Sequence, residues 1–491
     1  MIGEAILPTD STVLLGREDQ SEAEYHPHAY KLYRTRFWIL FVFSFLAFNQ
    51  CMFWLTFSPI ARSTEIYYNV TEATVDLLLN WGPIIFIPCL PITYKLLNSR
   101  NGLRKCILLV AISCFIATIL RVIPSIVTIH GKKHVSGIAV PFLHLGQIIN
   151  AACGPLVMAP VSQLSCLWFG TNERTRATSV AILAANFGCT IGFIITPYIV
   201  STPENIPYLL YLHVGLSFIA CILTFLYFPS IPPTPPSPAA ELIIYQPIQS
   251  RERTSVAMRI RNFIQCLSYP PFLLLSLAGG LLNGTFGAWT SLFATILTPM
   301  NYTESEAGWF GFVTSLSGII GGLSISVIAD KPRFQRRLKL LIIISLCLCL
   351  LSCLMFQTFV VTIFYDKPLL KSNVFVISLT LGLTGLFQGC SSPLIYECLA
   401  EIMFPLPESL SASVLTQYIN IVALVLLFIA PGRFKLMNLI VLAMISVTII
   451  MTLFVKVTYK RKDEDERKKR EKERLIIEQD CLGINNYYET I

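Results

Sequence analysis

Long apolar stretches dominate this chain, and short polar segments separate them. About twelve stretches reach roughly 20 residues, the length that a helix needs to cross the ~30 Å hydrocarbon layer of a bilayer. The expected spans are Phe37–Ile60, Thr74–Leu97, Cys106–Pro124, Ile138–Leu167, Ala177–Val200, Pro207–Phe228, Pro271–Leu297, Ala307–Ala329, Leu338–Phe364, Val374–Ala400, Ser409–Ala430 and Met437–Val457. The pattern predicts an all-α polytopic membrane protein.

The composition supports this class. Of the 491 residues, 54% are hydrophobic and only 13% are charged, which is too little charge to cover a soluble protein of this size. The 15 cysteines lie mostly within apolar stretches without metal-ligand spacing, so we expect small buried side chains and no metal site. We find no nucleophile motif or phosphate loop, so we expect no enzyme, no cofactor and no nucleic-acid partner.

A Pro-rich and then basic segment interrupts the spans after the sixth. The predicted parts are a tail (1–36), a six-helix half (37–228), a linker (229–270), a second six-helix half (271–457) and a charged tail (458–491). Two six-helix halves joined by a long loop are typical of major facilitator transporters, which bind small molecules between the halves near the bilayer midplane.

The basic residues predict how the chain is oriented. With the N-terminus in the cytoplasm, 29 of the 37 Lys and Arg residues fall on the cytoplasmic side and seven on the other, a strong positive-inside bias. Both tails are then cytoplasmic. The sequons at Asn69 and Asn301 fall on the opposite side and are candidate glycosylation sites, whereas the sequon at Asn283 lies inside a span.

The N-terminal tail contains "DSTVLL". Asp10 followed by Leu14 and Leu15 fits the acidic dileucine signal that clathrin adaptors bind, although such short patterns also occur by chance. A functional signal predicts a lysosomal or late-endosomal membrane, whose far side faces an acidic lumen.

Several segments resemble the lysosomal branch of solute carrier family 49, within the major facilitator superfamily. They are "FSFLAFNQCMFWLTFSPI", "LLNWGPIIFIPCL", "LHLGQIINAACGP", "WFGTNERTRAT", "ILTPMNYTESEAGWFGF" and "FPLPES". The resemblance implies a twelve-helix transporter that exports pyridoxine from lysosomes, driven by protons. The related feline leukaemia virus subgroup C receptor proteins carry choline and ethanolamine and have been discussed as heme exporters.

The first span carries three candidate substrate contacts. Gln50, Trp54 and Phe57 are spaced i, i+4, i+7, which places them on one face of a helix. The resemblance places Trp54 in an aromatic pocket around a cationic nitrogen; an indole face stabilises a desolvated cation by about 2 kcal/mol and also stacks on a pyridine ring. The alternative is a tryptophan that faces lipid.

The resemblance adds candidates from other spans. Asn186 and Asn420 match substrate-contacting amides of the relatives, and Trp289 matches the lysosomal branch. The choline carriers place their aromatic residue two positions earlier, where this chain has Gly287, which implies a differently shaped pocket. Packing between helices is the alternative role for Trp289.

His144 is a candidate proton carrier. It lies in the fourth span with Gln147 and Asn150 at a spacing of three, which forms one stripe. A histidine with an unperturbed pKa of ~6.5 titrates between lysosomal and cytosolic pH. A structural histidine that bonds a neighbouring helix is the alternative.

Acids and one cation complete the polar candidates within the spans. Glu397 is a second proton-coupling candidate, and Glu401, one turn later, is a candidate for gating or for a structural helix end. Arg121 either extends towards the membrane surface or holds an acid such as Asp76.

The interpretation is a lysosomal, proton-coupled transporter of a small organic nutrient, with pyridoxine favoured. Its expected partners are the substrate, protons, the bilayer and a clathrin adaptor. A choline, ethanolamine or heme transporter at another membrane is the alternative within the family, and a receptor or nutrient sensor that does not transport is the alternative outside it.

Overall fold

A computed structural model gives the arrangement of most of residues 30–474. The gaps are 98, 129–135, 171–172, 238–239, 242–243, 245–263, 265–267, 330, 332, 335, 366, 404–407, 431–432, 461–462, 464–466, 468–469 and 471–473, so Asp10, Leu14 and Leu15 lie outside the described residues. Within the described part, 12 helices are long and apolar enough to cross a membrane. The predicted all-α, twelve-span fold is confirmed.

The first half is built from six long helices. They are α1 (Thr35–Trp54), α3 (Glu72–Leu97), α4 (Gly102–Thr128), α5 (Ser136–Met158), α7 (Arg174–Ile199) and α8 (Ile206–Leu226). The expected fourth span is divided, because α5 stops at Met158 and the short helix α6 (Val161–Trp168) continues it. Most buried apolar side chains of the first half form two clusters within that half, and Leu55, Leu79 and Phe193 join the cluster of the second half.

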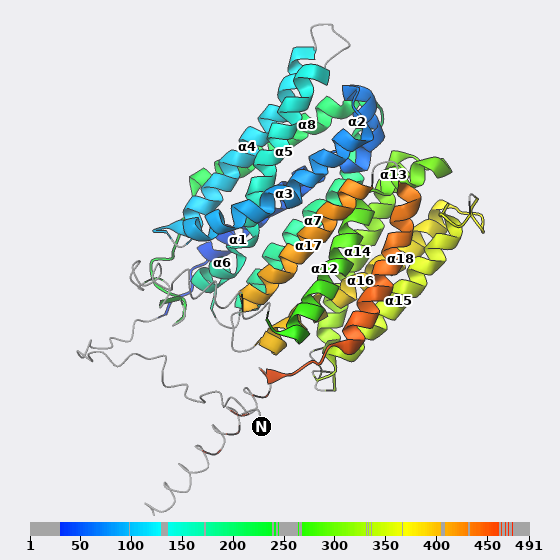
Figure 1. Cartoon of the computed structure of the whole chain (residues 1–491). Helices are drawn as coiled ribbons and strands as arrows, with labels where there is room; N and C mark the ends of the chain where they lie inside the picture. Colours follow the sequence, from blue (N-terminus) through cyan, green and yellow to red (C-terminus); the bar gives the residue numbers. More distant parts are fainter. Residues whose placement is uncertain are drawn as a thin grey trace, which may run out of the picture.

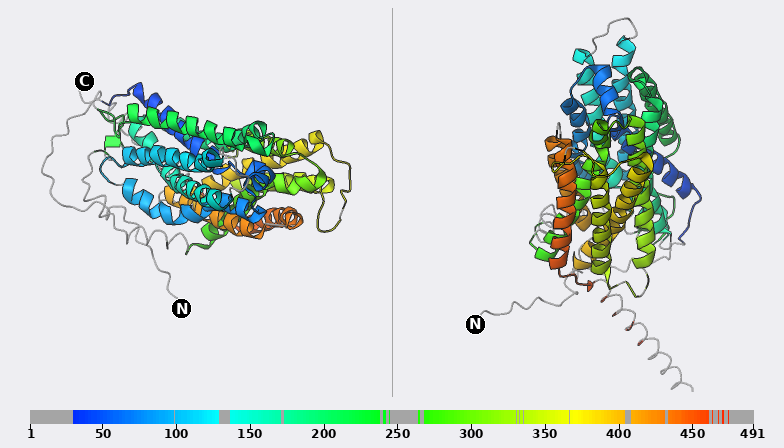
Figure 2. Two further views of the ribbon diagram at one scale, coloured as in Figure 1. Left: turned by 90° about the horizontal axis from the view of Figure 1, so that it is seen from above. Right: turned by 90° about the vertical axis from the view of Figure 1, so that its right-hand side faces the viewer.

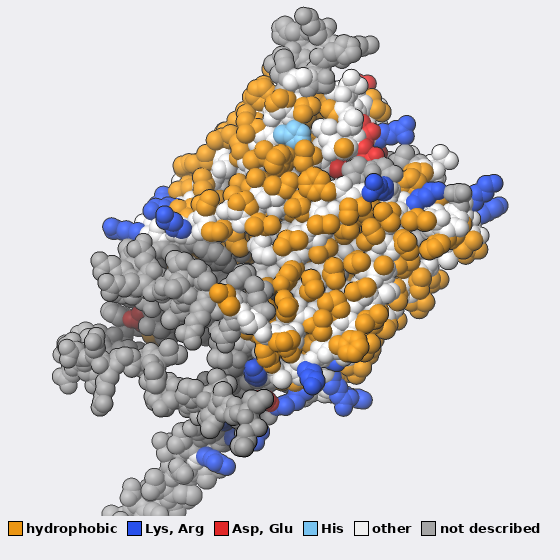
Figure 3. Space-filling view, in the orientation of Figure 1, with side chains coloured by type: hydrophobic (Ala, Val, Ile, Leu, Met, Phe, Trp, Pro, Cys, Tyr) orange, Lys and Arg blue, Asp and Glu red, His pale blue; other side chains and the backbone are white. Residues whose placement is uncertain are grey.

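The second half repeats this plan. Its long helices are α12 (Pro270–Ser291), α14 (Glu304–Ala329), α15 (Leu338–Phe359), α16 (Val374–Met403), α17 (Glu408–Ile429) and α18 (Phe434–Phe454). Figures 1 and 2 show the two sets of helices side by side along one long axis. Apolar side chains cover the visible face of the bundle, and charged side chains gather towards its ends (Figure 3), as expected for a surface in contact with lipid.

The first helix of each half is followed by short helical pieces at the same end of the bundle (Figure 1). After α1 come η1 (Ser58–Ile60) and α2 (Ala61–Tyr68), and after α12 comes α13 (Phe293–Leu297). We call this the α2 end, and the opposite end, where α1 begins and α18 finishes, the tail end. The exposed sequon residues Asn69 and Asn301 lie next to α2 and α14, at the α2 end.

Among the long helices, the halves contact each other through α7 with α14 and α3 with α17, and the short elements η1 and α2 contact α13 and α14 of the other half. Close packing at the α2 end depends on glycine. A Cβ added to Gly308 of α14 would lie less than 3.0 Å from the Phe193 carbonyl oxygen of α7, and one at Gly311 would meet the Phe193 ring. Ser58 also donates a hydrogen bond to the Ser291 carbonyl across the same boundary. The structure is therefore closed at the α2 end.

Helices α14 and α16 pack backbone against backbone within the second half. A Cβ at Gly321 would lie less than 3.0 Å from the Leu386 carbonyl oxygen, and one at Gly389 would come as close to Gly318. Small residues allow such close approach between membrane helices, so these two helices are held together tightly.

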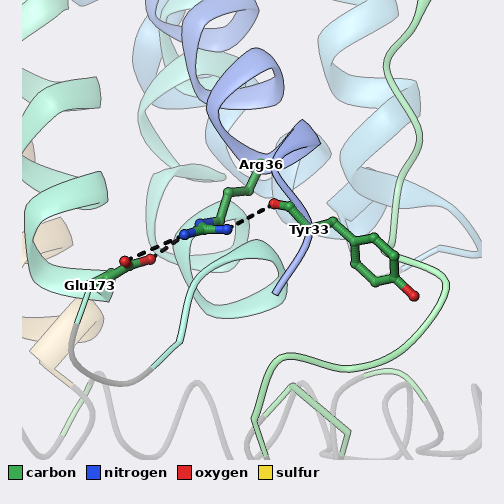
Figure 4. Close-up of polar contacts among 3 residues, drawn as sticks. All are labelled: Tyr33, Arg36 and Glu173. Atoms are coloured by element: carbon green, nitrogen blue, oxygen red, sulfur yellow. Dashed lines mark hydrogen bonds and ion pairs between the residues drawn. The ribbon is translucent and has the colours of Figure 1, made fainter. Parts of the chain in front are cut away.

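At the tail end, polar contacts hold the start of α1 to its own half (Figure 4). The Arg36 guanidinium pairs with the Glu173 carboxylate, Nε to Oε2 at 3.2 Å, and also donates to the Tyr33 carbonyl. The Tyr33 hydroxyl lies 3.1 Å from Thr234 Oγ1. The first residues of the linker are thus bonded to the first half.

Candidate transport site

Trp54 lies where α1 ends, beside the second half. Its indole Nε1 donates to the Leu79 carbonyl of α3 at 3.0 Å, and its ring packs against an apolar cluster that joins Leu55 and Leu79 of the first half to the core of the second half. The ring rests directly on Gly82, where a Cβ would collide with it. Trp54 is only partly buried, so the sequence candidate sits at the boundary between the halves.

Amides hold the end of α1 against α5. Gln50 Nε2 donates to the Asn150 carbonyl at 3.3 Å, and Asn150 Nδ2 donates back to the Gln50 carbonyl at 3.2 Å. Gln147 Nε2 donates to the Trp54 carbonyl at 3.2 Å. The stripe predicted on the fourth span therefore meets the predicted face of the first.

Phe57 differs from the prediction. Helix α1 ends at Trp54, so the regular i, i+7 relation to Gln50 is lost. Phe57 is 2% exposed and packs with Ile60 and Tyr68 in an apolar cluster of the first half. This placement favours a packing role for Phe57 over the predicted substrate contact.

Trp289 also differs from the prediction. It is fully buried within the second half, where Phe293 and Phe356 meet its ring edge-on. Its Nε1 donates to Asn438 Oδ1 of α18 at 3.0 Å. This placement favours the packing alternative for Trp289, because the ring is fully buried and its aromatic and hydrogen-bond partners belong to the second half.

The structure adds a polar group that the sequence analysis did not recognise. Gln388 Nε2 of α16 donates to Asn283 Oδ1 of α12 at 2.9 Å, and Ser392 Oγ donates to the same oxygen at 2.5 Å. All three side chains are partly exposed and lie near the middle of their helices. Asn283 entered the sequence analysis only as a sequon inside a span; the available signal was an amide near the middle of the seventh span and another near the middle of the tenth.

The predicted amides of α7 and α17 lie at a similar depth. Asn186 is exposed in the middle of α7, and Asn420 is partly exposed in the middle of α17 with its Nδ2 bonded to the Thr416 carbonyl at 3.0 Å. Amide groups from helices of both halves thus lie near the midpoint of the spans.

The predicted proton carrier His144 is partly buried. Its Nδ1 accepts a hydrogen bond from the Trp81 indole at 2.9 Å, which leaves Nε2 to carry the proton of the neutral ring. Sequence analysis missed a second histidine, His213 in α8. It is 1% exposed, its ring lies tilted against the Phe53 ring, and its Nδ1 lies 3.5 Å from Thr56 Oγ1.

Arg121 does not extend to the membrane surface. Its side chain is fully buried, and its Nη1 donates to the Phe53 carbonyl at 3.0 Å and to Thr56 Oγ1 at 3.2 Å. These bonds replace the expected pairing with Asp76 and fix the chain where α1 ends.

The two acids of α16 differ in their surroundings. Glu397 is partly exposed, whereas Glu401 is fully buried near the end of the helix. Tyr459, which follows α18, lies close to Glu401; burial raises the pKa of the Tyr459 hydroxyl, and Cys398 and Glu401 act in the same direction. Glu401 therefore lies inside the second half, next to the segment after α18. Among the described residues, no group of three His, Cys, Asp or Glu side chains could hold a metal ion.

Comparison with known proteins agrees with this architecture. The Major Facilitator Superfamily model matches residues 39–431. The Solute carrier family 49 member 4 homolog of Xenopus tropicalis is 30% identical over 420 residues, which is 82% of this chain and 86% of that protein. The chain belongs to solute carrier family 49 of the Major Facilitator Superfamily. The predicted family is confirmed, and this member of family 49 is a membrane transporter and no enzyme.

Other relatives of this family 49 protein are named for a substrate. The choline/ethanolamine transporter flvcr2a of Danio rerio is 25% identical and covers 78% of this chain and 77% of its own length. Among solved structures, the Escherichia coli xylose transporter XylE, in a partially occluded inward open conformation, matches with a TM-score of 0.61. At 14% identity over 86% of this chain and 98% of XylE, that similarity shows the fold alone.

Proposed function

We propose that this family 49 transporter works by alternating access and exports pyridoxine from lysosomes with protons. The main support for a transport site inside the bundle is that amide side chains near the middle of the spans are exposed. Asn186 is exposed, and Asn283 and Gln388 are partly exposed. Polar side chains at this depth are costly against lipid and belong in a water-filled or ligand-filled space.

The chemistry of these groups supports a polar aromatic substrate. The Trp54 indole offers a face for stacking on a pyridine ring, and the amides of Asn283 and Gln388 offer donors and acceptors for hydroxyl groups. A hydroxyl-bearing ring uses both features, whereas choline carries one hydroxyl and a permanent charge.

Choline or ethanolamine is the second candidate, because several relatives are named choline/ethanolamine transporters. Trp54 alone would also attract a cation. Against this candidate, Gly287 leaves open space where the resemblance places a second aromatic residue, and Trp289 is buried elsewhere.

His144 and Glu397 are the proposed proton carriers. His144 can take a second proton only at Nδ1, which would break its bond to Trp81. Proton uptake would therefore loosen α5 from α3, a physical route from luminal acid to helix movement.

Location and orientation rest on the tail and the sequons. The dileucine signal at Asp10, Leu14 and Leu15 supports delivery to lysosomes through a clathrin adaptor. Asn69 and Asn301 are both exposed at the α2 end, which supports a luminal α2 end, glycosylation at both positions and cytoplasmic tails. The closed α2 end is then the luminal gate of the proposed alternating access in its closed position.

Uptake by cells that display the L14A/L15A variant on their surface tests these proposals. We expect the variant to move to the plasma membrane and to take up labelled pyridoxine faster at about pH 5 than at about pH 7.4. Equal uptake at both pH values would reject proton coupling, and continued vesicular location would reject the sorting signal.

Substitutions separate the alternatives. Asn283→Ala should raise the KM for pyridoxine, while Gly215→Ala, at a helix position with no atom within 4 Å of the new methyl group, should not. Uptake of choline but not pyridoxine would favour the second candidate. A sensor would show uptake of neither and would lose its signalling output when residues after Tyr459 are removed.

A further inference from the structure

Helix α2 begins without a cap of its own. The first N–H groups of a helix have no partner within it and are usually bonded by a Ser, Thr, Asp or Asn at the N-cap. In α2 the N-cap residue is Ile60, whose side chain makes no such bond. Because Ser63 is only 7% exposed, water does not readily replace that cap.

The second half supplies the missing group. Glu304, in the first turn of α14, accepts a hydrogen bond from the backbone N–H of Ser63 through Oε1 at 3.0 Å. Its other oxygen, Oε2, accepts from the Ser63 hydroxyl. Ser63 is the third residue of α2, the position that an N-cap acceptor normally serves. A carboxylate there also benefits from the positive end of the helix dipole.

Helix α14 does not need Glu304 for its own start. Thr303 and Glu306 form a capping box: the Thr303 N–H donates to Glu306 Oε2 at 2.8 Å, and the Glu306 N–H donates to Thr303 Oγ1 at 3.2 Å. Of the two acids in this turn, Glu306 therefore caps its own helix and Glu304 caps a helix of the other half.

We propose that Glu304 is a positioning residue for transport, a latch that caps α2 across the boundary and holds the α2 end closed. The bond exists only while the halves are together at this end, so opening removes the cap of α2 as well as the contact. The latch favours the conformation open at the tail end and sets how readily the carrier turns to the α2 side. This inference rests on the alternating access proposed above but not on the identity of the substrate.

The full-length protein, purified and placed in lipid nanodiscs, allows a test without substrate. Amide hydrogen exchange is compared for wild type, E304A, E304Q, S63A and the matched control E306A. We expect E304A to raise exchange in α2 and at the contact between α7 and α14 together, by about tenfold in the opening equilibrium. E304Q keeps one acceptor oxygen and S63A keeps the backbone bond, so the exchange rates of these two variants should lie between those of E304A and wild type. E306A should affect only the first turn of α14.

Transport in proteoliposomes provides the second readout. E304A should change the apparent KM differently when substrate is added on the α2 side and on the tail side, which a merely structural defect would not do. Unchanged exchange at α7 in E304A, or equal effects of E304A and E306A, would overturn the latch. Altered exchange in E304A without pyridoxine transport by wild type would retain the latch and reject the proposed substrate.

Discussion

Replacing Gly308 by alanine adds a single methyl group where α14 meets α7. The new Cβ would lie less than 3.0 Å from the Phe193 carbonyl oxygen and 2.7 Å from the Pro197 ring. Ordinary contacts begin near 3.4 Å, and neither a backbone carbonyl nor a proline ring can swing aside. The halves must therefore separate at the α2 end by at least about 0.7 Å, or the closed conformation must carry the strain.

The size of the effect follows from the cost of overpacking. Extra methyl groups at tight contacts cost about 1–3 kcal/mol, which corresponds to a shift of about 5-fold to 150-fold between two conformations. The shift caused by Gly308→Ala should be about 5-fold, and the shift caused by the larger side chain in Gly308→Leu should be about 150-fold. Because alanine also favours helix formation over glycine by about 1 kcal/mol, Gly215→Ala serves as the control, since its methyl group would meet no atom within 4 Å.

Hydrogen exchange measures the shift directly. Exchange should rise in α2 and at the end of α7 for Gly308→Ala, rise further for Gly308→Leu, and remain at the wild-type level in α15, which lies away from this boundary. If both Gly308 variants keep wild-type protection at the α2 end, the halves do not close through this contact, and the reasoning is refuted.

Three further changes test individual contacts. Trp289→Phe should lower the free energy of unfolding by about 1–3 kcal/mol, because Asn438 loses its buried donor, and should leave the substrate KM unchanged; a raised KM without loss of stability would restore Trp289 to the site. Gly82→Ala should displace the Trp54 ring from α3 and raise the substrate KM. Adding Trp54→Phe to this variant should partly relieve the clash, because the phenyl ring is smaller. Equal KM values for wild type and Gly82→Ala would contradict this placement of Trp54. Glu173→Gln should cost less than about 1 kcal/mol in thermal unfolding, because the side chain of Glu173 is 39% exposed; a large loss would show that the pair anchors α1 more strongly than its exposure allows.

The number and length of the spans could be predicted because bilayer thickness limits them physically. Each apolar stretch of the sequence became a long helix, and the interruption after the sixth separated two halves. The helical spacing of Gln50 and Trp54 also placed both side chains where α1 bonds to α5 and α3, and their role as substrate contacts stays a prediction.

The placements that the sequence did not indicate have a shared cause. Phe57 was assigned by helical spacing, but spacing cannot show that α1 ends three residues earlier. Trp289 was assigned by its position in a span, but position cannot show whether a ring faces the other half or its own. The Asn283 cluster and the Glu304 latch depend on residues more than 100 and 240 positions apart, and no local pattern indicates such pairs.

The glycine contacts between α14 and α16 join these two helices so closely that they should move as one rigid unit. Gln388 lies beside the Gly318–Gly389 contact, and Glu304 lies 14 residues away along α14, an arm of about 20 Å. A tilt of only about 3° at the fulcrum would move the tip by about 1 Å, enough to pull a carboxylate out of bonding range. A small molecule that shifts α16 near the middle of the membrane would thus break the bond between Glu304 and Ser63 at the α2 end.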